Sequence, residues 1–379
     1  MSHLKCRKKQ IAFLTGFYQN IVICGNVRQT TLMLSNAQKE MTANYKILCD
    51  IGDGPNFLIG GREKPVNFDD IDKEDNLNRI YRIQFKQPPG NGQLERVVTT
   101  IKKRPEIELR FYGNYSEDLI DWSKLTDIQN LQIDLWKTNE LKAVSRLMNL
   151  RRLGINGNVK SKVSLKILEP LRNIETLYTS ISKDVESISK LQGLRFLSLR
   201  EIKHDNLDFL APLNNLKVLW LSFGSYNDFS GLSKIINLQK LWVHQARGFD
   251  NEIVGSVLQR CRSLWALKLD NLKHVINLGF IPGIPKLKYM SFEGIKNLDT
   301  YAPIKDSKAL EVIAGYKCRP ADKSLDGLIN LKEIWLGDSY PKTEIDKLLS
   351  SKATTNIWIR GKNLKGMGNL KNPFDLNEN

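Results

Sequence analysis

Histidine, cysteine and clustered glycine are the residue types through which this chain could perform metal, thiol or phosphate chemistry. The four histidines stand singly and lack the H-x-x-x-H spacing that presents two zinc ligands on one helix face. The five cysteines are odd in number, far apart and without C-x-x-C spacing, which argues against a disulfide framework or a zinc site. We therefore expect no bound metal, and thiols that are buried or idle.

Glycine clusters are the remaining chemical signal. Gly52-Asp53-Gly54 and Gly60-Gly61 do not extend into the G-x-x-x-x-G-K-S/T or G-x-G-x-x-G patterns that hold phosphates, so we interpret them as turns. The sequence also has no G-x-S-x-G nucleophile motif. It thus predicts a protein that is not an enzyme and uses no cofactor.

The composition is that of a globular protein with a strong positive charge. The chain has 379 residues, 41% of them hydrophobic, and a formal net charge of +16. It lacks the run of about 18 apolar residues that a membrane span needs. Such a charge favours acidic partners. We expect a monomer that binds a protein with an acidic surface, with nucleic acid as the alternative partner.

A repeat of about twenty-two residues organises most of the chain. From Glu106 onward the pattern apolar-x-x-apolar-x-apolar recurs, and eleven steps cover the 248 residues from Leu109 to Ile357. Each unit is one short strand plus a return segment, and neither half buries its apolar side unless neighbouring units stack. The central apolar pairs are Leu109/Phe111, Leu131/Ile133, Leu153/Ile155, Leu177/Thr179, Leu197/Leu199, Leu219/Leu221, Leu241/Val243, Leu267/Leu269, Met290/Phe292, Ile313/Gly315, Ile334/Leu336 and Ile357/Ile359.

The segments NLDFLAPLNNLKVLWLSFGS, YNDFSGLSKIINLQKLWVHQ and SLDGLINLKEIWLGD resemble bacterial leucine-rich repeats of the short, internalin-like kind. The resemblance covers about 250 residues. It implies an α/β solenoid with a curved parallel β-sheet on the concave side, short helices, 3-10 turns and loops on the convex side, and a role in holding another macromolecule. The asparagine that this family places three residues after the pair is present as Asn158 but replaced by Trp136, Ile202 and Gly224 elsewhere. We therefore expect an irregular turn there.

The repeat divides the chain into four regions. Residues 1–40 are expected to form an N-terminal tail or a signal-like extension, 41–104 an N-terminal capping region, 105–361 the solenoid, and 362–379 a loose C-terminal tail. The protein is expected to be cytoplasmic. It would instead be secreted or displayed on the cell surface, as an adhesin, if residues 1–40 act as a signal.

The outward residue inside each pair is the expected binding position. Four of the seven tryptophans stand there, as Trp220 and Trp242 in neighbouring repeats and Trp335 and Trp358 in another two. Three repeats between them leave an expected gap of about 19 Å. Large aromatic side chains are common anchors of protein recognition, although indoles lying flat along the sheet are the alternative. The predicted partner-binding residues are Phe196, Arg200, Trp220, Phe223, Trp242, His244, Lys268, Tyr289, Tyr316, Trp335, Trp358 and Arg360.

A second row of outward residues is basic. It stands two positions before each pair and holds Arg151, Arg195, Lys217, Lys288 and Lys332. Such a row meets phosphates in nucleic-acid-binding proteins, whereas a solvated basic edge is the alternative. Together the two rows predict a non-catalytic interaction module, with a nucleic-acid-associated scaffold as the alternative. The resemblance implies that such a module acts as an inhibitor, an immunity protein or a regulator.

Overall fold

The structure, a computed structural model, describes residues 47–51, 68–90, 92–156, 162–366 and 368–374. The expected extension at 1–40 and the glycine clusters of 52–61 lie outside the described residues. Every described residue belongs to one compact unit, residues 45–379.

The described residues form a 15-stranded sheet and a small second sheet. In the large sheet the strands from β1 to β16 pair in parallel in chain order, and β17 pairs antiparallel to β16. The second sheet consists of β8 (Lys203–His204) and β10 (Ser225–Tyr226). The strands of the large sheet are β1 (Ile47–Ile51), β2 (Ile80–Phe85), β3 (Glu108–Gly113), β4 (Asn130–Leu135), β5 (Arg152–Ile155), β6 (Thr176–Thr179), β7 (Phe196–Arg200), β9 (Val218–Ser222), β11 (Lys240–His244), β12 (Ala266–Asp270), β13 (Tyr289–Glu293), β14 (Val312–Tyr316), β15 (Glu333–Leu336), β16 (Asn356–Ile359) and β17 (Lys362–Lys365).

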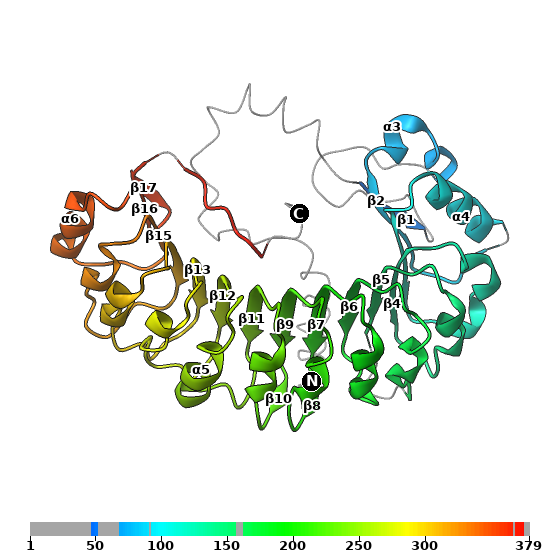
Figure 1. The fold of residues 1–379 in the computed structure, drawn as a ribbon. Coiled ribbons are helices and arrows are strands. Elements are labelled where there is room, and N and C mark those ends of the chain that lie inside the picture. The colour runs from blue at the N-terminus through cyan, green and yellow to red at the C-terminus, as the bar shows by residue number, and fades with distance from the viewer. Residues whose placement is uncertain (1–46, 52–67, 91, 157–161, 367, 375–379) are drawn as a thin grey trace, which may run out of the picture. The chain divides into compact units, whose positions relative to one another are not determined.

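Short helices and 3-10 turns return the chain from one strand to the next. Within this unit, Figure 1 shows the strands on the inner side of a curved ribbon and the turns and helices on its outer side. Among the described residues, no helix has both the length and the apolar character needed to cross a membrane. The α-helices are α3 (Glu74–Leu77), α4 (Gln93–Lys103), α5 (Asn251–Leu258) and α6 (Lys342–Ser350). The 3-10 helices are η2 (Phe68–Asp70), η3 (Glu117–Leu119), η4 (Trp122–Leu125), η5 (Lys142–Arg146), η6 (Leu165–Leu168), η7 (Val185–Lys190), η8 (Asp208–Leu210), η9 (Ser230–Lys234), η10 (Ile281–Gly283), η11 (Ala302–Asp306) and η12 (Asp326–Leu328).

The strand register confirms all twelve apolar pairs. Leu219 aligns with Leu241, Leu241 aligns with Leu267, and the same alignment runs from Leu109 to Ile357. Both members of every pair are buried, because alternate side chains of a strand point to the same face. The 3-10 turns supply the opposite wall of the core. The chain is therefore a leucine-rich-repeat solenoid.

The turn after the strand is regular in the central repeats, although the asparagine expected there is mostly absent. Glu201, Phe223, Gln245 and Asn271 each follow a strand with a positive φ between 48° and 59°. In each case the backbone N–H donates to the carbonyl of the last residue of the next strand, over 2.7 to 3.0 Å. Main-chain hydrogen bonds thus replace the missing side-chain ladder in these repeats. After β4 the N–H of Trp136 instead donates back to the Gly113 carbonyl at 2.9 Å, so the turn does vary along the solenoid.

An asparagine ladder does exist, at a different position of the repeat. The side-chain amide of Asn237 donates to the carbonyl of Asn214 at 2.8 Å, and that of Asn215 donates to the carbonyl of Gln192 at 2.9 Å. Asn173 and Asn149 make equivalent bonds two and three repeats before Asn215, and Gly193 stands at this position in the repeat between. These asparagines stand four positions before the pair, so they fix the chain as it enters each strand.

The sheet extends beyond both ends of the expected solenoid. Strands β1 and β2 continue it into residues 41–104, the expected capping region, and α4 buries Leu94, Val97 and Ile101. At the other end, residues 362–374 are not a loose tail. β17 pairs with β16, and Phe374 is buried against the inner face of the sheet.

Candidate functional site

The outward residues between the apolar pairs form one row across the inner face of the sheet. Trp220 aligns with Trp242, and Trp335 aligns with Trp358, as the repeat predicts. All four indoles are partly exposed. We call this line the concave row; it consists of Tyr178, Ser198, Trp220, Trp242, Lys268, Ser291, Ala314, Trp335 and Trp358.

Aromatic rings contact one another in series along the first part of the row. The ring centroids of Phe196 lie 4.9 Å from those of Tyr178 and of Trp220. Trp220 and Trp242 meet edge to face, with centroids 4.7 Å apart and an interplanar angle of 75°. Phe196, although predicted as a contact residue, is buried by these neighbours. The rings therefore support each other in fixed orientations, which lowers the entropy cost of contacting a partner.

The second tryptophan pair has a different geometry. Trp335 and Trp358 stack with centroids 5.0 Å apart and an interplanar angle of 13°. The indole N–H of Trp335 donates to Glu333 Oε2 at 3.3 Å, whereas Nε1 of Trp358 is buried without a hydrogen-bond partner. Nε1 of Trp220 is likewise buried without a hydrogen-bond partner. A buried donor without an acceptor costs free energy, and neither group has an acceptor among the described residues.

A charged cluster lies under the first tryptophan pair. Asp270 is only 2% exposed; its Oδ2 accepts a hydrogen bond from Trp242 Nε1 at 2.7 Å and lies 3.3 Å from Lys268 Nζ. The same ammonium group lies 4.1 Å from the centroid of the Trp242 ring. Asp270 Oδ1 has no hydrogen-bond partner. The cluster thus fixes the Trp242 indole and leaves one buried acceptor unused.

The other predicted contact residues lie at the edge where the strands end. The rings of Phe223 and His244 have centroids 4.8 Å apart, and Arg200 lies over the Phe223 ring at 5.3 Å. Tyr316, at the end of β14, is 42% exposed, and Arg360, just after β16, is exposed as well. The structure brings Arg200, Phe223 and His244 together beside Trp242, and places Tyr316 and Arg360 on separate strands.

An ionic network covers the first strands of the inner face, and the sequence analysis missed it. Arg82 Nε donates to Glu108 Oε1 at 2.6 Å, and Arg152 Nε lies 3.2 Å from the other oxygen of this carboxylate. Arg110 forms a second pair with Asp134 at 2.6 Å. All five residues stand at outward strand positions. This alternation is the feature of the sequence that could have indicated the network. On these strands the charged side chains of the inner face pair with one another.

Residues that follow β17 cover the middle of the concave row. Phe374 is 5% exposed and forms an apolar cluster with Ala266, Tyr289 and Ala314 that is separate from the solenoid core. Its ring centroid lies 6.3 Å from that of Tyr289. Burial raises the pKa of Tyr289, so its hydroxyl stays protonated. Tyr289 was predicted as a free contact residue, whereas here it contacts the chain's own segment.

The predicted basic row is partly neutralised by the acids within it. Arg151 lies 2.5 Å from Glu175, and Lys332 Nζ lies 2.9 Å from Glu311 Oε2. The hydrogen bond from Lys332 holds the pKa of Glu311 below its usual range. Lys288 approaches the other oxygen of Glu311 at 3.8 Å. The row therefore carries less free positive charge than its sequence indicates.

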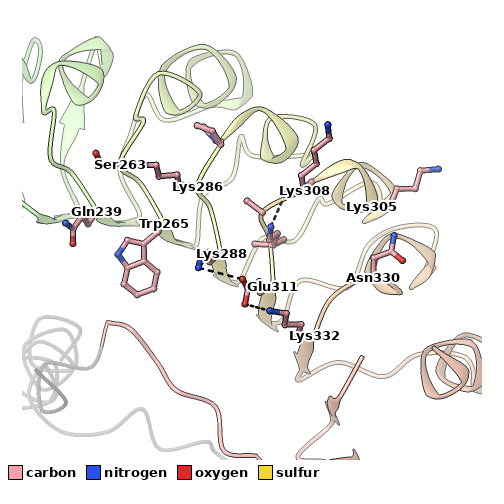
Figure 2. Close-up of a pocket in the computed structure, with 14 residues that line it drawn as sticks. Gln239, Ser263, Trp265, Lys286, Lys288, Lys305, Lys308, Glu311, Asn330 and Lys332 are labelled. Carbon is pink, nitrogen blue, oxygen red and sulfur yellow. Dashed lines mark hydrogen bonds and ion pairs between the residues drawn. The ribbon is translucent and has the colours of Figure 1, made fainter. Parts of the chain in front are cut away.

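A lysine-rich depression lies at the same edge. Its volume is about 1020 Å³, and Trp265, Ser263 and Glu311 contribute to its walls. Figure 2 shows lysines from several consecutive repeats around it, with the Lys288–Glu311–Lys332 contacts at its base. The lysines that line it are Lys286, Lys288, Lys305, Lys308 and Lys332. Five lysines and one glutamate line this depression, so its lining carries a net positive charge.

Comparison with known proteins identifies no close relative. No family model matches the chain. A stretch of 250 residues is 23% identical to the ATP synthase subunit alpha of Tropheryma whipplei, over 59% of this chain. The chain spans 46% of the length of that relative, and no G-x-x-x-x-G-K-S/T motif accompanies the match.

Two of the solved structures that resemble this chain are bacterial proteins. An internalin of Listeria monocytogenes shares 18% sequence identity at a TM-score of 0.48, over 78% of this chain and 83% of that chain. A leucine-rich-repeat protein of Leptospira interrogans shares 17% identity at a TM-score of 0.47, over 72% of this chain and 75% of that chain.

Proposed function

We propose that this protein is a non-catalytic interaction module that binds a protein partner on the concave face of its solenoid. The observation that supports this proposal is the concave row, in which the partly exposed indoles of Trp220, Trp242, Trp335 and Trp358 share one face. Exposed aromatic side chains that are held rigidly are favoured as anchors of protein recognition, because they bury a large area at low entropy cost.

Binding would be stoichiometric, and the tryptophan pairs would be its anchors. Arg200, His244, Lys268 and Arg360 would supply polar contacts around them. The net charge of +16 and the lysine-rich depression favour a partner with an acidic surface. Such a module acts as an inhibitor, an immunity protein or a regulator when the surface that it covers is the active face of its partner.

The test is affinity capture from native lysate with the full chain as bait. We expect Trp220→Ala combined with Trp242→Ala to lose the captured partner, since hot-spot residues often cost 2 kcal/mol or more, which is roughly 30-fold in Kd. Trp136→Ala is the matched control, because this tryptophan is 43% exposed but lies beyond the end of β4, outside the row. Equal capture by wild type and the double variant would reject the proposed face.

A second candidate function, association with a polyanion, is favoured by the lysine-rich depression. Phosphate contacts release counterions, so such binding falls steeply with added salt. Retardation of RNA or DNA at low salt that disappears when Lys286, Lys305 and Lys308 become Gln would favour this candidate. The cellular compartment is proposed to be the cytoplasm, and mapping the mature amino terminus by mass spectrometry tests the alternative of secretion.

A further inference from the structure

Two neighbouring strands carry small outward side chains in the middle of the concave row. Ser291 in β13 and Ala314 in β14 lie between Lys268 and the indole of Trp335, and a third small outward residue, Ala266 in β12, stands two residues before Lys268 in register with Tyr289. Neighbouring strands lie about 4.8 Å apart, so these small side chains beside bulky ones leave space for a large side chain. The sequence shows this space as the gap between the tryptophan pairs.

The chain fills this space with its own phenylalanine. Phe374 is 95% buried there, since it is 5% exposed, and Trp242, Trp265, Trp335 and Leu370 pack around the cluster that it completes. Lys240 Nζ donates to the carbonyl of Pro373 at 2.7 Å. Figure 1 shows the segment after β17 on the inner side of the strands. An aromatic side chain and one adjacent carbonyl are thus what this pocket recognises.

The segment packs on the sheet without adding a strand to it. Residues 368–374 form neither helix nor strand, and besides Phe374 they contact the solenoid through Leu370, the Pro373 carbonyl and the N–H of Gly368, which reaches Asn356 Oδ1 at 3.3 Å. Gly366 has a φ of +82°, and a Cβ there would lie 2.4 Å from the Thr355 carbonyl oxygen, so only glycine turns the chain back here without strain. Because no strand pairing of the large sheet depends on residues 368–374, the segment can leave while the solenoid stays folded.

We infer that residues 368–374 are a displaceable internal ligand, and that a partner binds by inserting an aromatic side chain of an extended, acidic segment in place of Phe374. This inference deepens the proposed function and rests on it for the identity of the face. The acidic character follows from charge: Lys240 Nζ lies against the covering segment, and the chain carries a net charge of +16. The chain's own segment therefore serves as a template for the competing one.

Tethering determines how strongly the internal ligand competes. A short flexible connection gives the tethered segment an effective concentration of roughly 1 mM, so a free peptide must overcome this advantage. A peptide with the same sequence should bind the wild-type chain weakly. It should bind at least about tenfold more tightly once Phe374 no longer fills the pocket.

The experiment uses a fluorescent peptide of residues 369–379, NLKNPFDLNEN, and fluorescence anisotropy with the full chain. We expect Phe374→Ala to lower the peptide Kd at least about tenfold relative to wild type, and Phe374→Leu to give an intermediate value. A peptide with alanine in place of its phenylalanine should not bind. If Phe374→Ala fails to fold, the peptide Kd of Phe374→Leu is compared with that of wild type instead.

A filled pocket provides the matched control. Ala314→Trp, added to Phe374→Ala, should abolish peptide binding, whereas Ser198→Trp, which adds the same side chain to the concave row in β7, should not. Equal peptide affinity of wild type and the Phe374 variants, or binding that survives Ala314→Trp, would overturn the inference. No cellular partner is involved, so this assay and the capture test of Trp220 and Trp242 can fail independently.

Discussion

Asp270 shows how single residues keep the concave face in one conformation. Its carboxylate is almost fully buried, yet it holds both Trp242 Nε1 and the ammonium group of Lys268. Lys268 itself is 8% exposed. Two buried charges are tolerated only while they remain paired, because desolvation of either alone costs several kcal/mol. The orientation of the Trp242 indole therefore depends on an ion pair within the sheet surface.

Removing one member of this pair should cost more than removing both. We expect Asp270→Ala to lower the free energy of unfolding by about 3 kcal/mol, since it leaves the buried Lys268 charge without a partner. Lys268→Met combined with Asp270→Leu should return stability to within about 1 kcal/mol of wild type. Urea unfolding followed by tryptophan fluorescence measures both. A single variant as stable as the double variant would show that the pair is solvated.

At the scale of elements, the 3-10 turns set how closely successive repeats approach. Gly231 in η9 and Gly327 in η12 stand at equivalent positions, each directly against the preceding turn. A Cβ on Gly327 would lie 2.0 Å from the carbonyl oxygen of Tyr301, and one on Gly231 would lie 2.5 Å from the Leu207 backbone. Backbone atoms cannot yield as a flexible side chain does, so glycine is required for this spacing.

A methyl group at this contact should therefore separate two repeats. We expect Gly327→Ala to destabilise the protein by about 2 kcal/mol, which is typical of overpacking. Gly255→Ala is the control, because in α5 its nearest neighbour is Phe280 Cβ at 3.8 Å, and alanine should stabilise the helix by up to about 1 kcal/mol. Thermal unfolding compares the two variants. A change of melting temperature with the same sign in both variants would contradict the role assigned to the turn.

The strands and their neighbours could be predicted from sequence because one local pattern fixes them. Once Leu219 and Leu241 occupy the same position of the repeat, stacking aligns Trp220 with Trp242 without further information. The Asn237 ladder also has a local signal, an Asn-Leu pair that begins four residues before the apolar pair. The asparagine of the family pattern stands on the other side of the strand, so the resemblance does not indicate this ladder.

The covering of the concave row could not be predicted in this way. Phe374 is a single aromatic residue in a segment without periodicity, so nothing local indicates where it packs. Its position depends on the depth left by Ala266 and Ala314, which is a property of three stacked strands. The ion pair of Arg82 with Glu108 could not be predicted for a similar reason, because these charges are 26 residues apart and meet only through the strand register.

For the molecule as a whole, the sheet order makes stability a sum over neighbouring repeats. Each strand from β2 to β16 pairs only with the strands on either side of it, so no contact within the sheet links its distant parts directly. In such a stack a local defect weakens its own repeat and the adjacent interfaces, while distant repeats keep their packing.

A cavity in one repeat should therefore have a local effect on hydrogen exchange. Leu219 in β9 and Leu131 in β4 are both fully buried. We expect Leu219→Ala, at a cost of about 2–5 kcal/mol, to accelerate amide exchange in β7, β9 and β11 but not in β2 to β4. Leu131→Ala should give the reverse pattern. Exchange that rises equally along the sheet in both variants would mean that the stack unfolds as one cooperative unit, and the nearest-neighbour description would not apply.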